Sequence, residues 1–67
     1  MLEFDISDQS KQPPYGTNII LWVSYSWYKP VRRLGDTYWY VDSNGDMTAD
    51  TVGIHTLKNA KMYAVIK

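Results

Sequence analysis

A mainly β fold, a small antiparallel sheet of four to five strands, is predicted by two features of this sequence. Several short segments alternate apolar and polar residues with a period of two, and no long segment shows the 3.6-residue period of an amphipathic helix. An Asn44-Gly45 pair follows the aromatic segment 37–43, and this order is typical of a β-hairpin. The 67 residues suffice for one small domain, 1–67.

The first half of the chain is expected to hold two strands separated by a loop. Residues 2–6 alternate apolar and acidic or polar side chains, which predicts a short strand with one buried face. Residues 8–16 contain two prolines and a glycine and are predicted to form a loop. Residues 17–25 are rich in β-branched and aromatic side chains, which favours a central strand that continues towards Tyr28.

A basic loop or irregular crossover is predicted for residues 29–35, because Pro30 removes a backbone donor. Strand 37–43 follows it. A two-residue type I′ turn at Asn44-Gly45 would place Val41 opposite Thr48 and start a returning strand over 46–49.

The last quarter is less regular. Val52 and Ile54 alternate as in a strand, whereas Asp50 is a candidate cap for one helical turn, and we expect extended or irregular structure over 50–59. Residues 61–67 are predicted to form the final strand. The pattern leaves open whether the sheet closes into a small SH3-like barrel.

Composition excludes several classes of protein. There is no Cys, so disulfides, thiolate chemistry and Cys-based zinc sites are absent, and an intracellular, cytoplasmic protein is expected. The longest apolar run, 19–23, is far shorter than a membrane span, so no membrane association is expected. Seven acidic residues balance seven basic ones, which argues against nucleic-acid binding through net charge alone.

No catalytic, cofactor or metal site is predicted. The segment 42–53 resembles a calcium loop at its start, but glycine falls at the fourth position and Gly53 stands where a bidentate Glu is needed. A hairpin turn explains the same residues. His55 is the only histidine and has no supporting motif, so we expect that the chain is not an enzyme.

The most suggestive group of residues is aromatic and basic. It comprises Trp22, Tyr25, Trp27, Tyr28, Lys29, Arg32 and Arg33, with Tyr38, Trp39 and Tyr40 on the next strand. Rings beside cations bind single-stranded nucleic acid, and Trp, Tyr and Arg also anchor protein interfaces. The alternative is that many of these rings are core residues. We predict that the partner-binding residues are Trp27, Tyr28, Lys29, Arg32, Arg33, Tyr38 and Tyr40.

The order of short motifs resembles the phage and prophage family catalogued as the domain of unknown function numbered five hundred fifty-one. The motifs are Phe4-Asp5-Ile6-Ser7, Pro13-Pro14-Tyr15-Gly16, the hydrophobic strand 19–23, Gly35-Asp36-Thr37-Tyr38-Trp39 and Ala64-Val65-Ile66. Phe4 stands where that family usually has Trp, and the sequence ends at Lys67, where the family commonly continues into a Trp-containing, Pro-rich tail. The resemblance implies a phage-associated accessory protein acting in a host cell.

Three functional hypotheses follow. The first is a small phage-encoded protein-interaction module that binds, and inhibits, a host or phage protein through its aromatic and basic surface. The alternative is a nucleic-acid-binding β-domain that uses Lys29, Arg32 and Arg33. The third is self-association into a homodimer, which would cover unpaired sheet edges.

Overall fold

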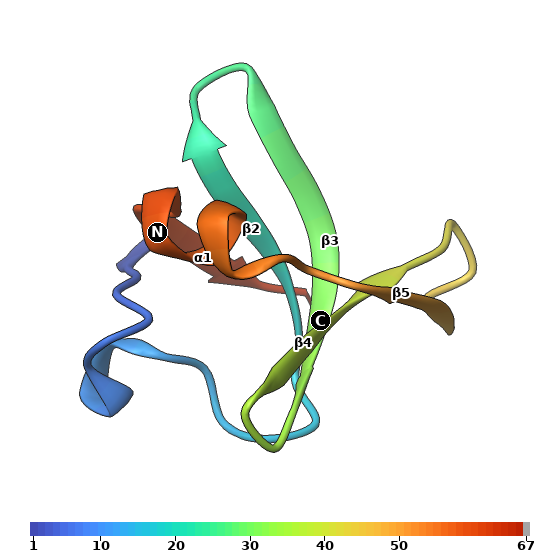
Figure 1. The fold of residues 1–67 in the computed structure, drawn as a ribbon. Helices are drawn as coiled ribbons and strands as arrows, with labels where there is room; N and C mark the ends of the chain where they lie inside the picture. Colours follow the sequence, from blue (N-terminus) through green and yellow to red (C-terminus); the bar gives the residue numbers. More distant parts are fainter. Residues whose placement is uncertain (67) are drawn as a thin grey trace.

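The computed structural model of this chain describes residues 1–66. Within these residues six strands form one antiparallel sheet. The strand order is β1-β6-β2-β3-β4-β5, and Figure 1 shows how strongly this sheet is twisted. The strands are β1 (Leu2–Glu3), β2 (Asn18–Ser24), β3 (Trp27–Leu34), β4 (Thr37–Val41), β5 (Met47–Thr51) and β6 (Met62–Val65). The helical segments are the 3-10 turn η1 (Gln9–Lys11) and the helix α1 (Ile54–Asn59). The mainly β prediction is confirmed, with six strands instead of four to five.

The first strand is shorter than predicted. Only Leu2 and Glu3 pair with β6, and the N–H of Phe4 makes a last hydrogen bond to the carbonyl of Lys61 at 2.8 Å. The chain then turns, because the Asp5 carboxylate accepts hydrogen bonds from the N–H and the hydroxyl of Ser7 at 2.9 and 2.6 Å. These bonds favour the ionised form and lower the pKa of Asp5 below its usual value.

Strand β3 replaces the loop or crossover that was predicted over residues 29–35. The N–H of Arg33 donates to the carbonyl of Thr17, so the backbone groups of alternate residues, including Pro30, point away from β2. On that side β4 pairs with β3 only from Val31 onwards. The donor that Pro30 lacks is therefore not needed, and proline is tolerated at this open edge.

The turn between β4 and β5 also differs from the prediction. Val41 pairs with Met47, not Thr48, and among residues 1–66 only glycines have a positive φ. The N–H of Gly45 donates to the carbonyl of Asp42, and Gly45 has φ +84°. These features describe a three-residue loop, a type I turn closed by a left-handed glycine, in place of a type I′ turn.

Helix α1 corrects the expectation of extended or irregular structure over 50–59. It is six residues long, begins after Gly53 without a side-chain cap, and buries Leu57 against the core. A helix this short is not stable by itself, so its packing on the sheet determines its formation. Asp50 lies in β5 and caps nothing.

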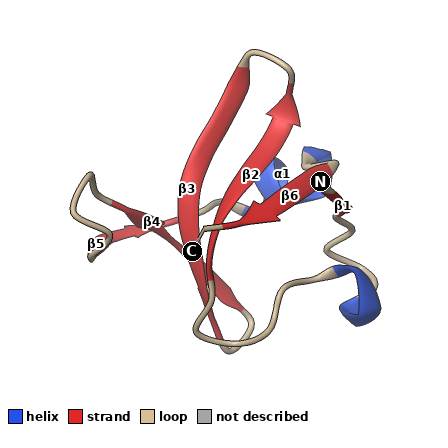
Figure 2. Ribbon diagram, turned by 180° about the vertical axis from the view of Figure 1, so that it is seen from behind, coloured by secondary structure: helices blue, strands red, loops and turns tan. Residues whose placement is uncertain are grey.

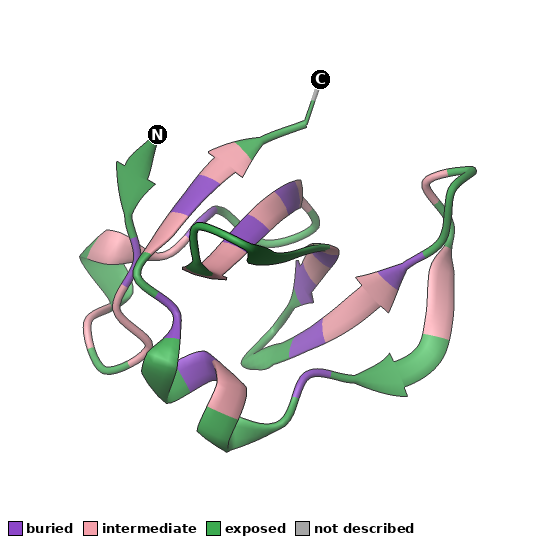
Figure 3. Ribbon diagram, turned by 90° about the horizontal axis from the view of Figure 1, so that it is seen from above, coloured by how far each residue is buried: buried purple, intermediate pink, exposed green. Residues whose placement is uncertain are grey.

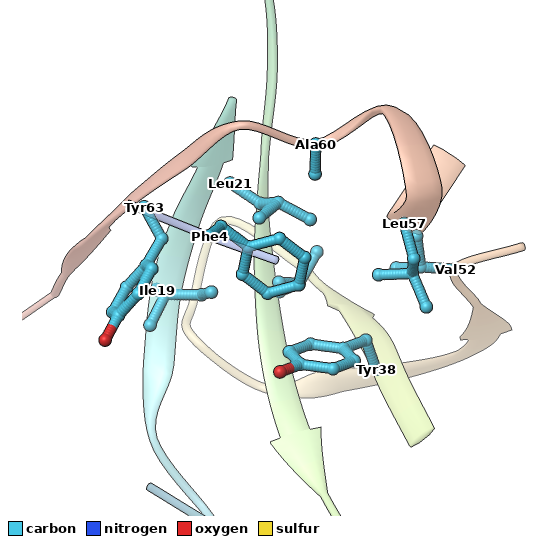
Figure 4. Packing of buried hydrophobic residues seen from close by; sticks show 9 residues of the cluster. Phe4, Ile19, Leu21, Tyr38, Val52, Leu57, Ala60 and Tyr63 are labelled. Carbon is cyan, nitrogen blue, oxygen red and sulfur yellow. The ribbon is translucent and has the colours of Figure 1, made fainter. Parts of the chain in front are cut away.

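The core lies between the concave side of the sheet and α1. Figure 4 shows the ring of Phe4 at its centre, with Tyr38 and Tyr63 packed edge-on at 5.6 and 6.2 Å between ring centroids. The full cluster is Phe4, Ile19, Leu21, Val31, Tyr38, Val52, Leu57, Ala60 and Tyr63. The sheet is open, and its shape is compatible with the small barrel-like fold that the sequence left undecided.

Candidate partner-binding surface

The end of the β2–β3 hairpin projects beyond the rest of the sheet. Strand β6 pairs with β2 only over residues 19–22, and β4 pairs with β3 only over residues 31–34. Residues 23–30 consequently have no third strand beside them. Figures 1 and 2 show this end rising past α1, and Figure 3 shows that its turn is exposed.

A β-bulge shapes this end. The register between β2 and β3 shifts between Trp22 and Ser24, so Val23 is an extra residue on β2. A bulge increases local twist and re-aims the side chains beside it. Tyr25 and Ser26 then form the turn. We call the five large side chains of this hairpin end the aromatic tip: Trp22, Val23, Tyr25, Trp27 and Tyr28.

The rings of the aromatic tip are unusually accessible for a domain with so small a core. Tyr25 is 91% exposed, Tyr28 54% and Trp27 38%. Trp22 and Tyr28 are directly opposite across the two strands, with ring centroids 5.7 Å apart and planes inclined at 35°. Met62 of β6 lies opposite Trp22 on its other side. Cross-strand neighbours share one face, so these three side chains form an apolar row.

Two open hollows border the aromatic tip, and Val23 lines both. The first, of about 370 Å³, is formed by Trp22, Val23, Ser24, Tyr25, Lys61 and Met62. The second, of about 330 Å³, is formed by Val23, Trp27, His55, Thr56 and Asn59. The first hollow is nearly all apolar, and Lys61 is the one charged residue that lines it, so the hollow suits an apolar side chain.

Three of the seven predicted partner-binding residues lie together at this hairpin end. Trp27, Tyr28 and Lys29 are consecutive on β3, and all three are exposed. Trp27 and Lys29 point to the side of the sheet that carries α1, and Tyr28 points to the opposite side. The structure therefore brings these residues into one projecting element but onto two faces.

Arg32 and Tyr40 are committed to contacts inside the molecule. The Nε of Arg32 donates to the side-chain oxygen of Asn18 at 2.6 Å, and its terminal NH2 nitrogen donates to the carbonyl of Gly45 at 2.9 Å. Arg32 thereby fastens the β4–β5 turn to β2. Tyr40 is half-buried and packs against the core.

Arg33 and Tyr38 were expected on a contact surface, and this expectation is wrong. Tyr38 is fully buried and Arg33 is 4% exposed. The Arg33 guanidinium donates to the carbonyls of Pro13 and Gly35 at 2.8 and 3.0 Å, and the ring of Tyr15 covers it at 4.4 Å. Period-two alternation along β3 places Arg33 on the inward face of the sheet. The N-terminal loop supplies the Pro13 carbonyl and the Tyr15 ring, and these contacts offset the cost of burying the guanidinium.

Charge is distributed unevenly around the aromatic tip. The segments 17–35 and 51–66 contain no Asp or Glu, and all seven carboxylates lie in the N-terminal segment or in and around the β4–β5 hairpin. Lys29, Lys58 and Lys61 are exposed near the tip, and the ion pairs among residues 1–66 involve none of them. Lys58 and Lys61 nevertheless share a hollow with Glu3 and Asp5, so carboxylates of the N-terminal segment lie close to these two cations.

Sequence reasoning left Val23, Lys61 and Met62 out of the site. Lys61 and Met62 are about 40 residues from Trp22 in sequence. Only the pairing of β6 with β2 brings them close to it. The Ser24-Tyr25-Ser26 segment carried a weak turn signal, but its neighbours favoured a continuous strand. Recognising that turn would have placed Tyr25 at an exposed position.

Other features of the described chain add no further site. Within residues 1–66 no cluster of three or more His, Asp or Glu side chains is arranged to hold a metal ion. No helix among these residues is long and apolar enough to span a membrane. No family model, curated protein sequence or solved structure matches this chain.

Proposed function

We propose that this chain is a small protein-interaction module that binds its partner through the aromatic tip. The observation that carries the proposal is the exposure of Tyr25 and Tyr28 on a hairpin end that has no third strand beside it. Rings displayed in this way contribute little to folding. Apolar surface gathered at one place on a small domain usually marks a contact site, and Tyr and Trp are the commonest anchors of protein interfaces.

The burial of Arg33 and the hydrogen bonds of Arg32 favour a protein partner over nucleic acid. Arg33 is buried and Arg32 is bonded to Asn18 and Gly45, so two of the three cations expected to hold phosphates are engaged elsewhere. Lys29 is the remaining cation of that group. The resemblance to a phage family extends the proposal to a host protein as partner and to inhibition as the outcome.

A capture experiment with matched variants tests this proposal. The immobilised chain, a Tyr25→Ser/Tyr28→Ser variant and a Leu34→Ser variant are exposed to the same cell lysate, and bound proteins are quantified by mass spectrometry. Leu34 is the control because it is an apolar residue of β3, 42% exposed, at the end opposite the tip.

We expect a protein that the wild-type chain and Leu34→Ser retain and that the double variant loses. With that protein purified, calorimetry should show binding weakened at least about 10-fold by the double variant, as for the loss of an interface anchor. Equal binding by the double variant, with its circular dichroism unchanged, would contradict the proposal.

A further inference from the structure

We infer that Asn44 is a site of spontaneous deamidation that the folded β4–β5 turn suppresses, so that the reaction proceeds only when this hairpin opens. The site is independent of the proposed function, because Figure 1 shows the β4–β5 turn (yellow) away from the end of the β2–β3 hairpin. The inference is supported by the Asn-Gly pair itself, by the conformation of the turn and by the contacts that hold the turn in place.

The chemistry of the site follows from the residue pair. The backbone nitrogen of Gly45 loses its proton to a base in solution and attacks the side-chain carbonyl carbon of Asn44. The side-chain nitrogen takes up a proton and leaves as ammonia, and a five-membered succinimide ring remains. Water then opens the ring at either carbonyl, which gives aspartate or isoaspartate at position 44. Asn44 is exposed, whereas the other two asparagines precede Ile19 and Ala60, whose side chains crowd the attacking nitrogen.

The conformation of the folded turn keeps the two reacting groups apart. Asn44 is the third residue of the type I turn 42–45, a position where ψ is about 0° in turns of this type. A five-membered ring needs Cβ and the Gly45 nitrogen nearly eclipsed about the Cα–C bond, whereas this ψ sets them about 120° apart. Asn44 must therefore rotate out of the turn before it reacts. The rotation breaks the hydrogen bond of 3.0 Å from the N–H of Gly45 to the carbonyl of Asp42.

Contacts from outside the turn oppose this rotation. Arg32 of β3 donates to the Gly45 carbonyl at 2.9 Å, and the side chain of Asn18 donates to the same oxygen at 3.3 Å. The Asp42 carboxylate accepts from the N–H groups on either side of Gly45 at 2.9 and 3.0 Å, so its negative charge lies near the Gly45 nitrogen. This charge disfavours the loss of a proton from that nitrogen. The reaction is therefore coupled to the opening of the hairpin.

The product alters the hairpin permanently, because the ammonia is lost. Isoaspartate at position 44 adds one methylene carbon to the backbone of the turn, which displaces Gly45 from the Asp42 carbonyl and from Arg32. Aspartate at this position keeps the backbone but adds a third carboxylate beside Asp42 and Asp46. We expect the isoaspartyl chain to have a Tm lowered by about 4–8 °C, as for the loss of one hydrogen bond in a domain of this size.

The test follows deamidation of the full chain at pH 8 and 37 °C, in buffer and in 6 M guanidinium chloride. Mass spectrometry of the tryptic peptide 34–58 reports on Asn44 alone, because this peptide contains no other asparagine and no glutamine. The variant Arg32→Gln removes the contact with the Gly45 carbonyl. The control Leu57→Val weakens the core without touching the turn.

We expect Asn44 to react at least about 30-fold more slowly in buffer than in guanidinium chloride, since opening the turn breaks one neutral and one charge-assisted hydrogen bond. Arg32→Gln should react about 10-fold faster than the wild type in buffer. It should react equally fast in denaturant, because residue 32 is 13 positions from Gly45 in sequence. Leu57→Val should react as the wild type does under both conditions.

Three results would overturn the inference. Equal rates of the wild type in buffer and in denaturant would show that the folded turn gives no protection. An unchanged rate for Arg32→Gln in buffer would show that the contact with β3 does not control the reaction. Equal acceleration in Leu57→Val and Arg32→Gln would show that the whole chain must unfold, in place of the hairpin alone.

Discussion

Arg33 and Tyr38 lie directly opposite each other on β3 and β4, and together they attach the N-terminal loop to the sheet. The hydroxyl of Tyr38 donates to the side-chain oxygen of Gln12 at 2.9 Å, and Arg33 donates to the carbonyl of Pro13. All buried side-chain polar atoms in residues 1–66 have a hydrogen-bond partner. An unpaired polar group in this position would cost about 1–3 kcal/mol, so these bonds make a polar interior tolerable.

The Tyr38 hydroxyl gives a prediction at the residue scale. Burial raises its pKa from 10.0 to about 12, and the positive charge of Arg33 opposes that rise. Between pH 10 and 12 the unfolded chain therefore binds fewer protons at this group than the folded chain does. The free energy that the neutral Tyr38 hydroxyl contributes to folding is fully present below pH 10. It is lost as the pH rises from 10 to 12.

We expect the urea midpoint of the wild type to fall between pH 9 and 11.5 more than that of Tyr38→Phe. The variant loses the bond to Gln12 and should be about 1 kcal/mol less stable at pH 7. Because the two proteins differ only in this hydroxyl, the difference between their pH profiles reports on Tyr38. Parallel profiles would show that this hydroxyl does not govern the alkaline loss of stability.

At the scale of elements, the two hairpins of the meander have different roles. The β4–β5 turn is pinned: the Asp42 carboxylate accepts from the N–H groups of Asn44 and Asp46, and Arg32 donates to the Gly45 carbonyl. The β2–β3 turn carries Tyr25, and no third strand pairs with the hairpin beside it. The pinned hairpin stabilises the sheet, and the projecting hairpin is available for contact.

Gly45 gives the prediction at this scale. Its φ of +84° lies in the left-handed region, where a Cβ costs about 1–2 kcal/mol. Gly45→Ala should therefore lower the free energy of unfolding by about that amount in urea denaturation. Gly45→Asn should cost less, because Asn tolerates this conformation. Since only the side-chain nitrogen of Asn18 lies near the position of the added Cβ, at 3.9 Å, equal losses in both variants would contradict a backbone origin.

For the molecule as a whole, the N-terminal segment completes the core. Phe4 is 3% exposed and joins the rings of Tyr38 and Tyr63, which belong to strands β4 and β6. A domain of 67 residues has a total stability of roughly 3–10 kcal/mol at ~0.05–0.15 kcal/mol per residue. The burial of one central ring therefore contributes a large part of the free energy of unfolding.

Phe4→Ala should cost about 3–5 kcal/mol, because it removes the ring and leaves a cavity. We expect a Tm lowered by at least about 10 °C, with much of the chain unfolded at 37 °C. Calorimetry and circular dichroism measure this loss. Leu2→Ala, at a position 54% exposed on β1, is the control and should cost less than about 1 kcal/mol. Similar losses of stability in the two variants would contradict the central role of Phe4 in the core.

The sequence by itself determined the β class, the antiparallel arrangement and the approximate positions of β2, β4 and β6. Local signals were sufficient there, because alternation and β-branched or aromatic composition act within a few residues. The same signals placed Trp27, Tyr28 and Lys29 in an aromatic and basic group, and all three are exposed at the projecting hairpin end.

Only the tertiary structure decided the remainder. Pro30 is acceptable in β3 because the pairing of β4 with β3 ends at Val31, and α1 forms because Leu57 has a core to pack against. Arg33 and Tyr38 are buried because the distant loop residues Gln12 and Pro13 satisfy their polar atoms. The hollow beside Tyr25 exists because β6 brings Lys61 and Met62 to Trp22, and contacts of such long sequence separation leave no local signal in the chain.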